Sequence, residues 1–217
     1  MLARALLLDF DGVIADTQNH HIAAWQRTLC ALGLHVPDEV AARSAEIDDR
    51  EFLRELFASQ QIEGGDIEGW VRKKQALTVS LLRDAPRIYP GVHELVGRLH
   101  DRMRLAVVTG TWRQNVEAVL AASGLAGAFE LVVGKEDVNR VKPDPEAYLL
   151  ALRRLGCSGS QAVAIEDSPS GLAAATAAGI PCIALGHRRE FGEWVGSAVY
   201  FSGLEPVSGL LQYLRLT

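Results

Sequence analysis

Residues 6–17, which read LLLDFDGVIADT, constrain the fold more than any other stretch of this 217-residue chain. The apolar run at 5–8 is short and closely bounded, as is typical of a buried parallel strand. Two carboxylates follow it, Asp9 and Asp11, and Gly12 then lets the backbone turn away. Side chains two residues apart on a strand point the same way, so both acids are expected to reach one crevice. Close carboxylates repel, and a divalent cation or one raised pKa relieves that repulsion.

After residue 17 the pattern becomes helical and stays so to about residue 82. Ile22, Trp25 and Leu29 recur at helical spacing, Asp48 or Asp49 can cap a second helix, and Asp66 starts a third. From Tyr89 onwards, short apolar runs alternate with helical patterns. Strands are expected at 105–108, 129–133, 162–165, 181–185 and 198–201, and helices at 92–99, 116–122, 144–155, 168–179 and 210–214.

This alternation predicts an α/β protein with a Rossmann-like, doubly wound parallel sheet. The helical block interrupts the alternation between the first and second strands, which indicates an all-helical cap domain inserted into the core. The expected boundaries are 1–16 and 83–217 for the α/β catalytic core, and 17–82 for the helical cap.

Polar side chains follow several of the predicted strands, where function gathers in an open α/β sheet. Besides the two aspartates there are Thr109 and Thr111, then Glu166 and Asp167, with Lys142 in a loop before the next helix. Each has an ordinary explanation as a strand-end or surface residue. Together, at one edge of the sheet, they predict a reactive site.

Acids without histidine or cysteine partners favour Mg²⁺, while a lysine and hydroxyl groups suit the oxygens of an anion. One aspartate can then attack phosphorus, giving an aspartyl phosphate that water hydrolyses, while the other moves the proton. The cation and the lysine would neutralise the charge on the phosphoryl oxygens.

Four segments in order, DFDGVIADT, VVTGT, VKPDP and AIEDS, resemble the motifs of the haloacid dehalogenase-like (HAD) hydrolase superfamily. The helical insert resembles that family's C1-type cap. Within the superfamily, the sequence most resembles the β-phosphoglucomutase and phosphoglycolate phosphatase-like group. The resemblance implies Asp9 as nucleophile, Asp11 as general acid and base, and Lys142 as a catalytic cation. It also implies phosphate binding by Asp9, Thr109, Gly110 and Lys142, and Mg²⁺ binding by Asp9, Asp11 (through its backbone carbonyl), Asp167 and Glu166.

The expected function is a Mg²⁺-dependent phosphomonoester hydrolase acting on a small phosphorylated metabolite. Asp11 argues against a true dehalogenase, which lacks an acid there. Two alternatives stay open: a phosphomutase of the β-phosphoglucomutase type, and a non-catalytic module that binds phosphorylated ligands. The second motif, at 109–115, looks more like that of the phosphatases, and the segment at 46–50 departs from the mutase pattern.

Four cap residues are candidates for substrate contact: His21, Arg50, Lys74 and Trp25. Three of them also have a simpler interpretation. His21 is equally a polar first-turn residue, Trp25 lies at a core-facing helical position, and Lys74 with its neighbour Lys73 is expected on the solvated side of its helix.

The net charge of −5 argues against nucleic acid or an anionic membrane as partner. No segment reaches transmembrane length without a charge or a breaker, and the N-terminal apolar run is too short for a signal peptide. Three widely spaced cysteines suggest neither a disulfide framework nor a zinc site. A cytoplasmic monomer or small homo-oligomer is therefore expected.

Overall fold

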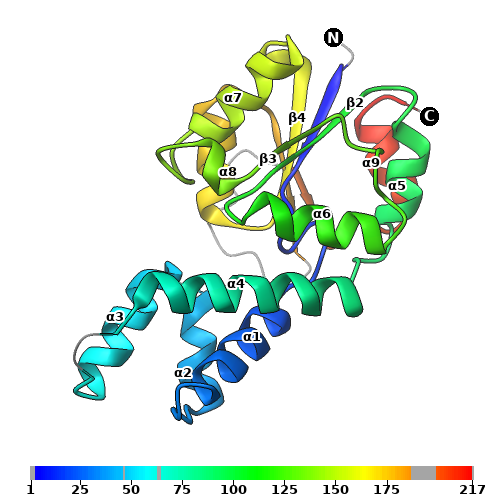
Figure 1. Ribbon diagram of the computed structural model, residues 1–217. Coiled ribbons are helices and arrows are strands. Elements are labelled where there is room, and N and C mark those ends of the chain that lie inside the picture. The colour runs from blue at the N-terminus through cyan, green and yellow to red at the C-terminus, as the bar shows by residue number, and fades with distance from the viewer. Residues whose placement is uncertain (1–2, 46, 63–64, 187–198, 217) are drawn as a thin grey trace. The chain divides into compact units, whose positions relative to one another are not determined.

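The computed structural model describes residues 3–45, 47–62, 65–186 and 199–216 (Figure 1). The chain divides into two compact units. The first, here the α/β unit, combines residues 1–16 with 87–217, and the second, the helical unit, spans 17–86. The predicted cap, 17–82, stops inside the last helix of the helical unit, because that helix continues to Asp84.

A six-stranded parallel sheet forms the centre of the α/β unit, in the order β3-β2-β1-β4-β5-β6. The strands are β1 (Ala5–Leu8), β2 (Arg104–Val108), β3 (Leu131–Val133), β4 (Ala162–Glu166), β5 (Cys182–Leu185) and β6 (Val199–Phe201). All four residues of β1 are fully buried, as its unbroken apolar run requires. The predicted doubly wound sheet is therefore confirmed. Ala198, the first residue of the last predicted strand, lies outside the described residues.

Helices cover both faces of this sheet: α5 (Val92–Leu99), α6 (Arg113–Ala122), α7 (Glu146–Leu155), α8 (Pro169–Ala177) and α9 (Val207–Tyr213). The buried residues of α7 and α8 share one core cluster with alternate residues of five strands. Figure 1 shows α5 and α9 on the opposite side of the sheet. The chain order reverses around β1, which lies between β2 and β4, and such a switch point is where α/β proteins place their ligands.

The start of α8 follows from two consecutive residues just after β4, Ser168 and Pro169. The Ser168 side chain accepts a hydrogen bond from the backbone N–H of Gly171 at 3.1 Å, and Pro169 occupies the first helical position. A serine cap followed by proline satisfies one free N–H and removes another. The helix therefore begins immediately beyond Asp167, at the carboxyl edge of the sheet.

The helical unit consists of α1 (Gln18–Cys30), α2 (Asp38–Ala42), a 3₁₀ turn (Arg43–Ala45), α3 (Asp49–Ser59) and α4 (Ile67–Asp84). Its apolar core is built around Trp25, which is fully buried and packs at 5.1 Å between ring centroids against Phe52. Trp25 is therefore a packing residue, as its helical position indicates. Asp48 and Asp66 cap α3 and α4 through hydrogen bonds to backbone N–H groups.

α2 and the 3₁₀ turn after it were not predicted from the sequence. A five-residue helix spans little more than one turn, so it carries no usable apolar periodicity. In the described part of the chain, no helix is long and apolar enough to cross a membrane.

Candidate active site

β1 and β4 bring three acidic residues to one end of the sheet. The backbone N–H of Asp9, just past β1, donates to the carbonyl of Ile165 on β4 at 3.0 Å, so the two strands stay paired at this point. Glu166 ends β4 and Asp167 follows it. Carboxylate oxygens of Asp9, Glu166 and Asp167 all lie within 4.8 Å of one another. Two separate motifs of the sequence thus contribute to one cluster.

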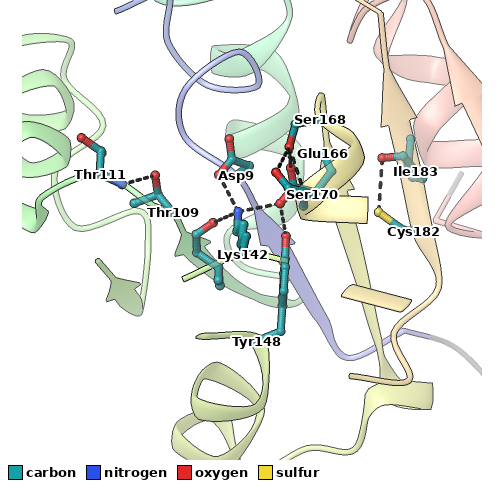
Figure 2. A network of polar contacts seen from close by, with 12 residues as sticks. Asp9, Thr109, Thr111, Lys142, Tyr148, Glu166, Ser168, Ser170, Cys182 and Ile183 are labelled. Carbon is teal, nitrogen blue, oxygen red and sulfur yellow. Dashed lines mark hydrogen bonds and ion pairs between the residues drawn. The ribbon is translucent and has the colours of Figure 1, made fainter. Parts of the chain in front are cut away.

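Lys142 lies at the centre of this cluster, as Figure 2 shows. Its Nζ donates to Asp9 Oδ1 at 2.7 Å, to Glu166 Oε1 at 2.5 Å and to the carbonyl oxygen of Val108 at 2.8 Å. An ammonium group has three protons to donate, and three acceptors receive them. The lysine side chain is only 9% exposed, so it is a component of the cluster and not a surface residue.

The electrostatics of this cluster favour a charged lysine. Burial alone would lower the pKa of Lys142, but the carboxylates of Asp9 and Glu166 outweigh that effect and raise it. Burial also raises the pKa of Glu166, while Lys142 and the hydroxyl of Tyr148, which donates to Glu166 Oε1 at 2.6 Å, act in the opposite direction. The site therefore holds a fixed positive charge among three carboxyl groups.

Gly12 provides the space in which Asp167 lies. Its φ of +91° is a conformation that L side chains rarely adopt. A Cβ at this position would also fall 1.7 Å from Asp167 Oδ2. Gly12 is therefore required for two reasons: the turn needs its positive φ, and Asp167 needs the space that a side chain would fill.

Replacement of Gly12 by alanine is expected to abolish activity because it must displace the Asp167 carboxylate. Gly33→Ala is the matched control, since Gly33 also has a positive φ, +76°, but nothing lies within 4 Å of its added Cβ. Both variants should lose roughly 1 kcal/mol or slightly more of stability through backbone strain. Only Gly12→Ala should lose turnover, measured by phosphate release at saturating Mg²⁺. Equal activity in the two variants would contradict this role of Gly12.

The donor set fits Mg²⁺, which prefers carboxylate oxygens and keeps several waters. Asp9 and Asp167 offer carboxylate oxygens, and Glu166 lies with them in the same group of possible ligand atoms. Glu166 Oε1 also accepts hydrogen bonds from Lys142 and Tyr148. The side chain of Asp11 is not part of this group; its predicted contact is through the backbone carbonyl.

The predicted phosphate-binding segment follows β2. Thr109 is buried, and its Oγ1 accepts a hydrogen bond from the backbone N–H of Thr111 at 3.1 Å. The Thr111 hydroxyl in turn accepts from Nδ2 of Asn115, which is fully buried. Gly110 is exposed, with no atom within 4 Å of the place its Cβ would take. The Thr109 and Thr111 side chains are thus held by the fold, while the Gly110 backbone is open.

The prediction that Lys74 lies on the solvated side of its helix was wrong. Its side chain is 2% exposed and its Nζ donates to both oxygens of Asp49, at 2.9 and 3.1 Å. Trp25 Nε1 also donates to Asp49 Oδ1 at 3.0 Å, and His21 Nδ1 lies 3.0 Å from the lysine nitrogen. Lys74 is therefore buried and not on the solvated side of α4, because it pairs with Asp49, a buried acid 25 residues away in the sequence. Its neighbour Lys73 is exposed, as expected, and lies over the ring of Trp70 at 4.0 Å.

Arg50, another cap candidate, forms a two-point ion pair with Glu68. Its Nε donates to Glu68 Oε1 at 2.6 Å and its Nη2 to Oε2 at 3.0 Å. Such fork-shaped pairing fixes the guanidinium in one orientation. Arg50 and Lys74 are thus each neutralised by a carboxylate of the helical unit itself.

Three residues of these networks were not identified from the sequence: Tyr148, Asn115 and Asp49. Tyr148 occupies an apolar position of α7 and resembles a core residue, with no sign of the acceptor that its hydroxyl meets. Asn115 is the last residue of the segment 109–115 and lies at helical spacing from Thr111, which was a usable signal. Asp49 was considered only as a helix cap, a role that Asp48 fills.

A doubly wound parallel sheet with a carboxylate–lysine cluster at its switch point defines an α/β protein whose fold and site suit phosphoryl chemistry. The chain belongs to the haloacid dehalogenase-like hydrolases, because the model of that family matches residues 6–185. Its named relatives include phosphatases, in agreement with the predicted enzyme class.

Two curated relatives illustrate the similarity. The fructose-1-phosphate phosphatase YqaB of Escherichia coli is 33% identical over 82% of this chain and 94% of its own length. The phosphorylated carbohydrates phosphatase of Thermotoga maritima is 30% identical over 81% of this chain and 82% of its own length. Among solved structures, CbbY from Rhodobacter sphaeroides in complex with phosphate has a TM-score of 0.81 at 30% identity, covering 97% of this chain and 99% of that one.

Proposed function

We propose that this chain is a Mg²⁺-dependent phosphomonoester hydrolase that acts on a small phosphorylated sugar through an aspartyl-phosphate intermediate. The observation that carries the proposal is the position of Lys142 Nζ, 2.7 Å from Asp9 Oδ1 and inside the carboxylate cluster. A fixed cation beside a carboxylate nucleophile offsets the repulsion between that carboxylate and an anionic substrate.

In the first step, an oxygen of Asp9 attacks phosphorus and the bond from phosphorus to the sugar oxygen breaks. Asp11, in its protonated form, gives its proton to that leaving oxygen, so the sugar departs as an alcohol. Lys142 and the segment that begins at Thr109 hold the phosphoryl oxygens during the transfer.

In the second step, Asp11 takes a proton from a water molecule, which attacks phosphorus. The bond between Asp9 and phosphorus breaks, releasing inorganic phosphate and restoring both aspartates. Mg²⁺, held by Asp9, Asp167 and the backbone carbonyl of Asp11, with Glu166 beside them, would neutralise charge on the phosphoryl group. The other groups of the site bind the substrate, orient it and move the protons without the help of the metal.

Two relatives support a sugar phosphate as the substrate class. The Escherichia coli protein is named for fructose 1-phosphate, and the Thermotoga maritima protein for phosphorylated carbohydrates. We further propose that the helical unit is the cap that selects among such substrates, with His21 among the residues concerned.

A phosphomutase is the second candidate. A structure described as a putative beta-phosphoglucomutase from Thermotoga maritima has a TM-score of 0.81 at 28% identity, covering 97% of this chain and 99% of that one. A mutase must also bind a sugar that carries two phosphates, for which cationic side chains are useful. The ion pairs of Arg50 with Glu68 and Lys74 with Asp49 favour the hydrolase.

The test is phosphate release from a panel of sugar phosphates, including fructose 1-phosphate and β-glucose 1-phosphate. With Mg²⁺, we expect release from at least one of them, loss of release with EDTA, and recovery when Mg²⁺ is restored. Conversion of β-glucose 1-phosphate to glucose 6-phosphate without free phosphate would favour the mutase. No turnover of any substrate would favour the non-catalytic phospholigand-binding module.

A further inference from the structure

Tyr148 is a buried residue that the proposed reaction does not use. It lies in the first turn of α7, 0% exposed, within the core cluster on that face of the sheet. Its hydroxyl nevertheless points out of this apolar cluster and donates to Glu166 Oε1 at 2.6 Å, as Figure 2 shows. Burial raises the pKa of Tyr148 well above its ordinary value, so the phenol keeps its proton and acts as a donor.

The carboxylate of Glu166 is surrounded by the contacts that the described residues make with it. Oε1 accepts from Tyr148 and Lys142, and Oε2 lies 3.4 Å from the hydroxyl of Ser168. Gly171 of α8 leaves the carboxylate its space, because an added Cβ would fall 2.0 Å from Oε2. The side chain is 1% exposed, so water cannot replace a lost contact at low cost.

The position of Lys142 depends on this carboxylate. Among the described residues, three groups accept the lysine's three protons, and Glu166 makes the shortest of these contacts, at 2.5 Å. The lysine nitrogen also lies 5.2 Å from the centre of the Tyr148 ring, within the range of a cation–π contact. The ring of Tyr148 thus contacts Lys142, and its hydroxyl contacts Glu166, which pairs with that lysine.

We propose that Tyr148 is a positioning residue of this active site: its hydroxyl holds Glu166 so that Glu166 aims the Lys142 ammonium at Asp9. The inference rests on the proposed hydrolase activity. It assigns Tyr148 a role in the rate of the chemical step, beyond the packing of its ring in the core.

The simplest test is Tyr148→Phe, which keeps the ring and removes one hydrogen bond. Loss of one bond to a charged group predicts a fall in kcat of about tenfold, because a misaimed lysine stabilises the transition state less. KM for p-nitrophenyl phosphate should change by less than about twofold, since the segment at Thr109 still binds the substrate and the charge on Lys142 is kept. Tyr213→Phe, which removes an exposed hydroxyl, is the control and should keep wild-type kinetics.

Gly171→Ala tests the same position from the opposite side. The added methyl group pushes the flexible Glu166 carboxylate aside while alanine favours the helix, so the fold should persist as kcat falls tenfold or more. Gly97→Ala is matched to it, because Gly97 lies inside α5 with nothing within 4 Å of its added Cβ. That control should keep wild-type kcat and a thermal midpoint at least as high.

The proposed function and this inference fail in different ways. A wild-type protein that releases no phosphate contradicts the proposed function. An active wild type whose Tyr148→Phe variant keeps the same kcat overturns the positioning role alone. So does a Tyr148→Phe variant whose lower rate follows entirely from a smaller folded fraction, measured by circular dichroism at the assay temperature.

Discussion

Asp9→Asn is expected to lower kcat for phosphate release by roughly 10⁴-fold or more, leaving a folded protein. An amide is nearly isosteric with a carboxylate, so the turn after β1 should persist. It cannot attack phosphorus to form an acyl phosphate, and it is a poorer metal ligand than a carboxylate. Lys142 retains Glu166 and the Val108 carbonyl as acceptors, so the cluster keeps its cation. The measurement is p-nitrophenyl phosphate turnover, with circular dichroism as the check on folding.

Asp101→Asn is the matched control for this loss. Asp101 is 85% exposed and pairs only with the neighbouring His100 among the contacts of the described residues, so its amide should have wild-type kinetics. A radiolabelled substrate should also label the wild-type protein transiently and leave Asp9→Asn unlabelled. Turnover by Asp9→Asn within tenfold of the wild type would be incompatible with Asp9 as the nucleophile.

The α/β unit could be predicted well because its signals are local. Each buried strand is a short apolar run, and the polar residues that matter come directly after the strands. Parallel strands must place those ends at one edge, so the sequence alone predicts that Asp9 and Glu166 lie close together. The starts of α7 and α8 also follow from local chemistry. The side chain of Asp144, two residues before α7, accepts a hydrogen bond from the backbone N–H of Glu146, and that of Ser168 accepts one from the backbone N–H of Gly171.

The partners inside the clusters could not be predicted because they depend on long-range contacts between buried polar groups. A lysine on an amphipathic helix is normally solvated, and nothing near Lys74 in sequence indicates that Asp49 lies beside it. In the same way, the sequence groups Glu166 with the metal ligands, but it does not indicate that the same carboxylate also accepts hydrogen bonds from Lys142 and Tyr148. Periodicity identifies the face of an element, and only the fold identifies what that face meets.

Lys142→Met is expected to remove both activity and stability. The substitution leaves Asp9 and Glu166 buried without a cation, and an uncompensated buried charge typically costs about 3–5 kcal/mol of unfolding free energy. It also removes the positive charge beside the nucleophile, which should lower kcat by roughly 10³-fold. The measurements are urea denaturation in EDTA, which excludes compensation by Mg²⁺, and phosphate release with Mg²⁺ present.

The double variant Lys142→Met, Glu166→Gln separates these two effects. Glutamine removes the most deeply buried negative charge and still accepts the hydrogen bond from Tyr148 through its amide oxygen, so part of the lost stability should return. The rate should stay low, because no lysine ammonium faces Asp9 in either variant. Lys73→Met, at an exposed lysine, should shift stability by no more than about 0.5 kcal/mol. If the double variant is no more stable than Lys142→Met, the charge on Glu166 is not what Lys142 compensates; if it regains wild-type kcat, the lysine is not needed for turnover.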